Sequence, residues 1–467
     1  MSFGLFNYSI KLIFLPFQTA RRVIIETDIR RLQFYGQWIR HIQIFSFTEK
    51  VSGHIYSVIA RYMFGKCLFP ALKSLHIHSF PGIPLGNLEI LPLLASSPLS
   101  TIEIKNVTYG YRVHLSSFLH EISRLHSAEN HPVSTLYLGG DIETSVLPFF
   151  RGFAGISKLT LKHEVTRFYI ENLRYLARHP LLSVLELDLS TDETQGIKPF
   201  PNSVVHTFQR IQTLALSGHA VHVLGILRYI HGEYLFRVKL NFFGLGPEAP
   251  TDVLGACVER CTTMTPSLLD LQLTLPNTTI LPKDLFATLR GPQSRIRSLQ
   301  VKSHPVDRPL FQSLFQDAGE WSDLEVLKLE PHATQPPISS LRVTDLVALP
   351  LLCTSFPKLH TLEIYLCHPD TNVAIIEALL RSQMQAVEQT NHCGLVNLKI
   401  LFLDPSNMTP FTIRDITLAM TTSRFFNYFF PNLQHLDISH HQQSLHSAWK
   451  DWCCAMVEMT MNKGLTQ

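Results

Sequence analysis

"FPKLHTLEIYLC", residues 356–367, places apolar side chains at Leu359, Leu362 and Ile364. This spacing of i, i+3 and i+5 follows a Phe-Pro pair, which is typical of a turn. From Leu362 onward the apolar and polar positions alternate, as they do in a strand with one buried face. A single stretch of this kind fits almost any fold, so its meaning depends on whether it recurs.

The same apolar triplet recurs along the whole chain. The first positions of successive copies lie 23 to 39 residues apart, which is a spacing that repeat proteins use. The other copies are Ile39/Ile42/Ile44, Leu72/Leu75/Ile77, Leu99/Ile102/Ile104, Val133/Leu136/Leu138, Ile156/Leu159/Leu161, Leu182/Leu185/Leu187, Ile211/Leu214/Leu216, Leu235/Val238/Leu240, Leu268/Leu271/Leu273, Ile296/Leu299/Val301, Leu324/Leu327/Leu329, Leu398/Leu401/Leu403 and Leu433/Leu436/Ile438.

Segments of helical period separate the triplets. In "HLSSFLHEISRLHS" one helix face would carry Leu115, Phe118, Leu119, Ile122 and Leu125. "TPFTIRDITLAM" offers Thr409 as an N-cap and Pro410 at the first helical position. Short strands that alternate with helices must run parallel, and each unit needs its neighbours to form a core. The predicted fold is therefore an α/β solenoid of parallel strand–helix repeats, curved into a horseshoe or an arc.

These units resemble leucine-rich repeats in a divergent form. The family usually has Asn or Cys three residues after the third apolar position, and here only Cys367 conforms, so we expect an irregular solenoid. The "FPALKSLHI" type of opening and the varied spacers resemble the repeat portion of fungal F-box proteins. The segment "TDIRRLQFYGQWIRHIQIF", residues 27–45, resembles the linker before their first repeat.

The resemblance implies three parts. Residues 1–30 would be a remnant of an F-box region, and residues 31–445 the degenerate leucine-rich-repeat solenoid. Residues 446–467, with "SAWKDWCCAMVEMT", would form a helix that caps the last repeat. In place of the acidic residue that normally follows the Leu-Pro of an F-box, Leu15-Pro16 is followed by Phe17. The F-box itself is therefore expected to be missing or degenerate.

Composition excludes several classes of function. The net charge of +3 is small for 467 residues, which argues against a nucleic-acid binder. The apolar residues 2–17 contain Lys11 and are too short to cross a bilayer, so no membrane association is expected. The eight cysteines show no regular framework, which favours a reducing compartment, the cytoplasm or the nucleus.

No motif points to catalysis, to a cofactor or to a metal. In "HEISRLH", His120 and His126 are six residues apart, whereas a zinc-protease helix needs a spacing of four. His76 and His78 would point to one side of a strand, but no third ligand is evident. A hydrolase hidden in the repeats would need a nucleophile beside a polarised histidine, and no spacing supports one. We therefore expect a protein that is not an enzyme.

The exposed face of the predicted strands is the candidate binding surface. The side chains between the second and third apolar positions would form one row, with acids and lysines mixed. Such a row suits a protein or a peptide better than a phosphate chain. Tyr137, Tyr365 and Phe402 are the candidate aromatic anchors. The candidate partner-binding residues are His76, Glu103, Tyr137, Glu186, Lys239, Lys328, Glu363, Tyr365, Phe402 and Asp437.

The function expected from this surface is protein recognition. The F-box resemblance implies the substrate-binding part of an SCF ubiquitin-ligase receptor, with the adaptor Skp1 and a cullin as partners. In that role no residue would do chemistry, and the bound substrate would be a protein or peptide. The alternative is a repeat scaffold with no link to a ubiquitin ligase.

Overall fold

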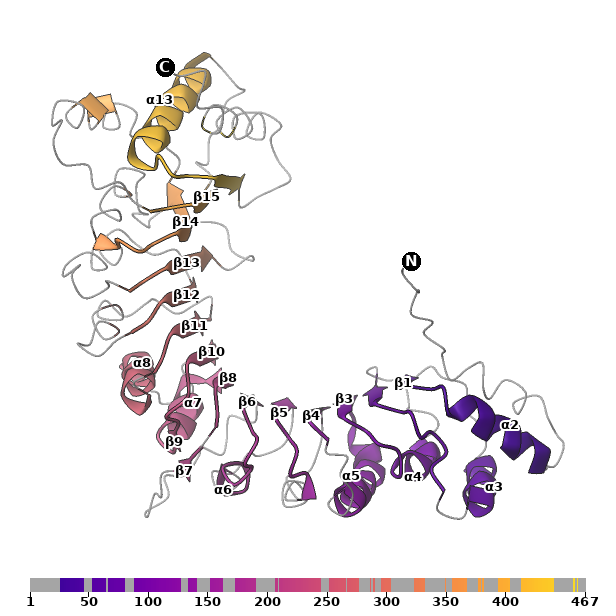
Figure 1. The fold of residues 1–467 in the computed structure, drawn as a ribbon. Coiled ribbons are helices and arrows are strands. Elements are labelled where there is room, and N and C mark those ends of the chain that lie inside the picture. Colours follow the sequence, from indigo (N-terminus) through magenta and orange to yellow (C-terminus); the bar gives the residue numbers. More distant parts are fainter. Residues whose placement is uncertain are drawn as a thin grey trace. The chain divides into compact units, whose positions relative to one another are not determined.

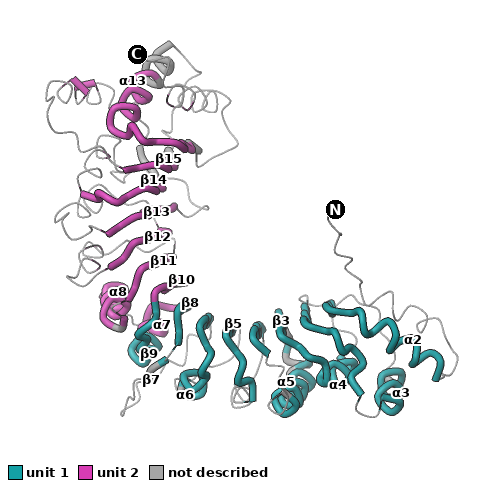
Figure 2. Tube along the Cα trace, viewed as in Figure 1, with its two compact units in different colours: residues 1–218, 225–235 teal, residues 219–224, 236–467 magenta. Residues whose placement is uncertain are grey.

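The structure is a computed structural model. It describes residues 26–45, 53–63, 66–79, 88–126, 133–140, 152–162, 173–189, 206–208, 210–244, 252–265, 267–276, 286, 289, 295–303, 323–331, 349, 355–367, 377–378, 380–381, 394–403, 413–440, 457 and 460. The chain divides into two compact units (Figure 2). Unit 1 comprises residues 1–218 and 225–235, and unit 2 comprises residues 219–224 and 236–467.

The strands of unit 1 form parallel ladders in chain order (Figure 1). They are β1 (His41–Phe45), β2 (Ser74–His78), β3 (Thr101–Val107), β4 (Thr135–Gly140), β5 (Lys158–Lys162), β6 (Val184–Asp188) and β8 (Thr213–His219), whose last residue belongs to unit 2. A separate two-stranded sheet pairs β7 (His206–Thr207) with β9 (Ile230–His231).

The strands of unit 2 follow the same rule. They are β10 (Arg237–Gly244), β11 (Asp270–Thr274), β12 (Ser298–Ser303), β13 (Val326–Pro331), β14 (Thr361–Cys367), β15 (Asn397–Leu403) and β16 (His435–His440). Each pairs in parallel with the next. The prediction of an α/β chain with parallel strands is confirmed.

Helices connect the strands, as parallel pairing requires. In unit 1, helices α3 to α6 lie along one face of the sheet (Figure 1). The helices of this unit are α2 (Glu26–Gly36), α3 (Gly53–Met63), η1 (Leu88–Ile90), α4 (Leu91–Leu94), η2 (Tyr109–Tyr111), α5 (Arg112–His126) and α6 (Leu173–Leu176). Helix α7 (Ala220–Leu227) is shared between the units, and α8 (Val253–Met264) and α13 (Ile413–Phe429) belong to unit 2.

The predicted triplets form the core. Every member of twelve copies, from Ile39/Ile42/Ile44 to Leu359/Leu362/Ile364, is less than 9% exposed. Leu433 and Leu436 of the last copy are buried as well. Strands β6, β8 and β12 alternate buried and half-exposed side chains, so one face of each is buried and the other remains accessible.

One triplet is out of register. The buried set is Leu395, Leu398 and Ile400, three residues earlier than the predicted copy at Leu398/Leu401/Leu403. "LVNLKILFL" satisfies the same spacing twice, because apolar residues stand at both sets of positions. Backbone pairing selects the earlier set, since Leu398 lies opposite Leu362. The prediction that placed Phe402 in the middle row was therefore wrong.

Two of the helical expectations fall on described residues. In α5, four of the five residues predicted for the buried face, Leu115, Phe118, Leu119 and Ile122, are buried, and Leu125 is half-buried. The aromatic run 424–431 lies in and just after α13, where Phe425, Phe426 and Phe430 are fully buried, as the core interpretation requires.

The ends of the predicted organisation lie largely outside the described residues. Residues 1–25, the expected cap at Thr409 and most of the expected C-terminal helix 446–467 fall there. Within that last segment, Thr460 is helical, and its hydroxyl donates a hydrogen bond to the Ser423 hydroxyl of α13 over 3.2 Å.

Candidate functional site

Strand register aligns the middle positions of the strands in rows, and most of their side chains are polar and accessible, with buried Thr160 and apolar Ala215 as exceptions in unit 1. In unit 1 the row is Gln43, His76, Glu103, Tyr137, Thr160, Glu186 and Ala215. In unit 2 it is Lys239, Gln272, Gln300, Lys328, Glu363, Lys399 and Asp437. A row of this kind arises because parallel strands in register align equivalent positions.

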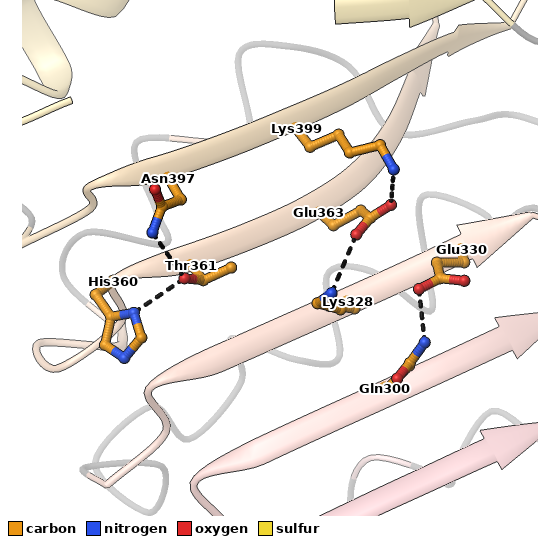
Figure 3. Close-up of polar contacts among 8 residues, drawn as sticks. All are labelled: Gln300, Lys328, Glu330, His360, Thr361, Glu363, Asn397 and Lys399. Atoms are coloured by element: carbon orange, nitrogen blue, oxygen red, sulfur yellow. Dashed lines mark hydrogen bonds and ion pairs between the residues drawn. The ribbon is translucent and has the colours of Figure 1, made fainter. Parts of the chain in front are cut away.

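Glu363 is the centre of a charge ladder in unit 2 (Figure 3). One carboxylate oxygen is 2.5 Å from Lys399 Nζ on β15, and the other is 3.5 Å from Lys328 Nζ on β13. The hydrogen bond to Glu363 raises the pKa of Lys399, and the charges of Asp437 and Glu330 act in the same direction. Lys328, Glu363 and Lys399 therefore form a chain of ion pairs with alternating sign across three strands.

Further polar contacts flank the ladder (Figure 3). Asn397 Nδ2 donates to Thr361 Oγ1 over 3.2 Å, and His360 Nδ1 lies 2.9 Å from the same oxygen. Gln300 Nε2 donates to Glu330 over 2.6 Å. The Asn397–Thr361 and Gln300–Glu330 contacts join different strands, which restricts these four side chains before any partner binds.

A shallow cleft of about 500 Å³ opens over β14, β15 and β16. Its polar lining consists of Thr361, Glu363, Asn397, Lys399, Gln434, His435 and Asp437. His435 and Asp437 are exposed, and within the described part of the chain Asp437 forms no salt bridge. The cleft thus combines a fixed ladder on one side with accessible donor and acceptor groups on the other.

A second cluster surrounds Tyr137 in unit 1. Lys105 Nζ is 5.3 Å and Lys162 Nζ 6.0 Å from the ring centroid, which is cation–π range. Glu103 bonds both Lys105 and His76, and His76 Nδ1 lies 2.5 Å from its carboxylate. Burial alone would raise the pKa of Glu103, but these two hydrogen bonds hold it below its usual value. Burial raises the pKa of Tyr137.

Most of the predicted site residues fall into two groups. His76, Glu103 and Tyr137 lie together in unit 1, on neighbouring strands. Lys328, Glu363 and Asp437 belong to the unit 2 row.

The other predicted site residues lie outside these two groups. Glu186 accepts a hydrogen bond from Thr160 over 3.2 Å, and Lys239 is exposed on β10. Tyr365 and Phe402 are placed by their backbones in β14 and β15, but their side chains lie outside the described set.

Sequence reasoning missed two features. Lys399 replaces Phe402 in the row, and the alternative triplet beginning at Leu395 was the signal for it. A cleft of about 840 Å³ in unit 1 was also missed, because its walls come from turns distant in sequence. It is lined by Leu181, Ser183, Phe208, Arg210, Gln212, Glu233 and Tyr234.

The described residues hold no group of three or more His, Cys, Asp or Glu side chains that could bind a metal ion. His76 faces Glu103, and His78 Nε2 lies 3.3 Å from Asn106 Nδ2. Within the same residues, no helix has the length and apolar character needed to cross a membrane.

Comparison with known proteins adds no identification. No family model matches the chain, and no curated protein matches it.

Proposed function

We propose that this chain is a protein-recognition module, built as an irregular leucine-rich-repeat solenoid, that binds a protein or peptide on the exposed sheet face of unit 2. The observation that carries the proposal is the ladder of Lys328, Glu363 and Lys399 beside a cleft of about 500 Å³.

The ladder supports recognition because its geometry is set in advance. Lys328, Glu363 and Lys399 are tied by ion pairs across three strands, so less side-chain freedom remains to be lost on binding. Mixed charge also favours a partner with complementary mixed charge over a uniformly anionic one. His435 and Asp437, at the open side of the cleft, would supply the specific polar contacts.

The F-box resemblance gives this module a cellular role. The solenoid would be the substrate-binding part of an SCF ubiquitin-ligase receptor in the cytoplasm or nucleus, with Skp1 and a cullin recruited through other residues. The competing role is a repeat scaffold that uses the same surface without a ligase.

Affinity purification of the tagged full chain, followed by mass spectrometry, tests both the proposed binding surface and the proposed cellular role. The wild type is compared with Glu363→Lys, which reverses the central charge of the ladder, and with Glu121→Lys. Glu121 is a control because it pairs with Arg124 on the outer side of α5 and takes no part in the sheet face. We expect Glu363→Lys to lose a partner that the wild type and Glu121→Lys retain.

The outcomes separate the proposals. If all three proteins recover the same partners, the sheet face of unit 2 is not the binding surface. Recovery of Skp1 and a cullin with all three, together with loss of one partner from Glu363→Lys, supports the ligase receptor. Loss of that partner without any recovery of Skp1 or cullin supports the scaffold.

A further inference from the structure

Large aromatic side chains are exposed on and just after α2 and in the last turn of α3. The exposed fractions are 60% for Phe34, 58% for Tyr35, 72% for Trp38 and 49% for Tyr62. Single exposed apolar residues are common, but a group of aromatic residues at one place usually marks an interaction site. These residues belong to neither of the clusters on the sheet face.

Helix α2 has two faces with different roles. Ile29, Leu32 and Gly36 are buried against unit 1. The helical turn continues past Gly36, since the Trp38 amide donates to the Tyr35 carbonyl over 3.1 Å. The exposed side carries a stripe at i, i+3, i+4 and i+7, and its members are Arg31, Phe34, Tyr35 and Trp38.

The last turn of α3 lies beside this helix. Gln33 Nε2 on α2 donates to Met63 Sδ on α3 over 3.1 Å, and the two helices are neighbours in Figure 1. Arg61 and Tyr62, which directly precede Met63, are both exposed. The aromatic–arginine face is defined here as Arg31, Phe34, Tyr35, Trp38, Arg61 and Tyr62.

The charge of this face is positive. Within the described residues, the guanidinium groups of Arg31 and Arg61 form no ion pair, whereas Arg30 is paired with Glu26 at 2.7 Å. Asp28 is buried. Glu89 acts on Tyr56, which is in the first turn of α3 and not the last. Among the described residues, the face therefore combines two arginines that form no ion pair with four exposed aromatic rings.

We propose that the aromatic–arginine face docks an acidic, partly apolar helical segment of another protein. The rings would pack against apolar side chains, and the two guanidinium groups would bind carboxylates as bidentate partners. A helical partner segment could lay an apolar stripe of its own along the ring stripe of α2, as paired amphipathic helices do.

Other occupants fit the charge less well. Residues 1–25 contain Lys11, Arg21 and Arg22 but no Asp or Glu, so they cannot supply the carboxylates. A symmetric dimer through this face would oppose arginine to arginine. Two unpaired arginines are few for a nucleic acid, whose binding depends on many phosphate contacts.

Photo-crosslinking in the intact chain tests the proposal. Benzoylphenylalanine is placed at position 34 and, as a control, at position 234, because Tyr234 is an aromatic residue of unit 1 with a similar exposed fraction of 62%. We expect position 34 alone to crosslink a segment of another protein that is rich in Asp and Glu. Arg31→Glu with Arg61→Glu should reduce that product about ten-fold, because like charges are then opposed. Arg178→Glu with Arg210→Glu, the matched charge change at two exposed arginines of unit 1, should not reduce it.

The contrary results are equally definite. Crosslinks to residues 1–25, to a second copy of the chain or to a segment that is not rich in Asp and Glu would overturn the proposal. So would a crosslinking yield that is unchanged by Arg31→Glu with Arg61→Glu. Sedimentation of the chain with phosphatidylserine vesicles, lost in the Arg31/Arg61 variant, would assign the face to a membrane surface instead. If a chain that carries Glu363→Lys still gives the full crosslinked product from position 34, the aromatic–arginine face acts independently of the sheet face.

Discussion

Glu363 on β14 and Lys399 on β15 stand opposite each other in the parallel register, with carboxylate and ammonium atoms 2.5 Å apart. Lys328 approaches the second carboxylate oxygen from β13, so one acid links three strands. Parallel strands place equivalent positions side by side, and alternation of sign along the row turns this into attraction. The exposed face of unit 2 is thereby an ordered surface.

Replacing Glu363 by Gln should lower the pKa of Lys399 toward the ordinary lysine value. The hydrogen bond from Glu363 is the main cause of the raised pKa, and Gln cannot supply the charge. A titration of the lysine side-chain amino groups by NMR measures the change. Glu330→Gln is the control, since Glu330 adds only a weaker long-range contribution. An equal effect of the two substitutions would contradict the ladder geometry.

Glu103→Gln should lower stability at neutral pH and leave acid stability nearly unchanged. Burial opposes ionisation of Glu103, but Lys105 and His76 lower its folded pKa overall. The stabilisation that ionised Glu103 gives the folded state is therefore complete above the ordinary Glu pKa of about 4.3. It is lost as the pH falls through the lower pKa that Glu103 has in the folded protein.

Urea unfolding at pH 7 and pH 3 tests this sign. We expect the free energy of unfolding of the wild type to exceed that of Glu103→Gln by about 1 kcal/mol at pH 7. This difference should be smaller at pH 3. Glu259→Gln, at an exposed position of α8, should show no such pH dependence. A difference that grows on acidification would refute the assigned ion pairs.

Leu395→Ala tests the corrected register. Leu395 is fully buried although it lies outside the triplet expected from sequence. Truncation of a buried leucine should reduce the free energy of unfolding by about 3 kcal/mol. Lys399→Ala, on the exposed face of β15, should cost less than about 1 kcal/mol. Comparable small losses for both would mean that the later triplet forms the core.

Gly36→Ala and Gly255→Ala should change stability in opposite directions. Both glycines are helical, so helix propensity alone favours alanine by about 1 kcal/mol. A Cβ at position 36 would lie 2.3 Å from the Leu68 carbonyl oxygen, whereas nothing lies within 4 Å at position 255. Thermal unfolding should therefore show a lower Tm for Gly36→Ala and a higher one for Gly255→Ala. Stabilisation by both would show that α2 can move away from Leu68 at little cost.

Much of the fold was predictable because it depends on local periodicity. The spacing of a triplet such as Leu359/Leu362/Ile364 predicts both a strand and the face of it that is buried. The apolar stripe of α5 predicts its buried face in the same way. The prediction failed at residues 395–403, where two overlapping triplets satisfy one pattern. Only hydrogen bonding to β14 distinguishes them, and that depends on a strand more than 30 residues away.

The candidate site was predictable only in part. Middle positions such as Glu103 and Glu363 follow from the strand pattern, so their exposure on one face could be expected. Their partners could not, because His76 and Lys399 are 27 and 36 residues distant in sequence. The exposed aromatic rings of α2 were also not predicted, since the pattern of a helix does not reveal which of its faces is covered by other elements.

The sequence by itself determined the succession of parallel strands and helices and the apolar face of each, since these follow from spacing within a few residues. Tertiary structure alone decided which charges meet, which of two leucine triplets is buried, and which glycine has room for a methyl group. Those outcomes depend on distances between atoms of different repeats, and spacers of variable length leave such distances unspecified until the strands pair.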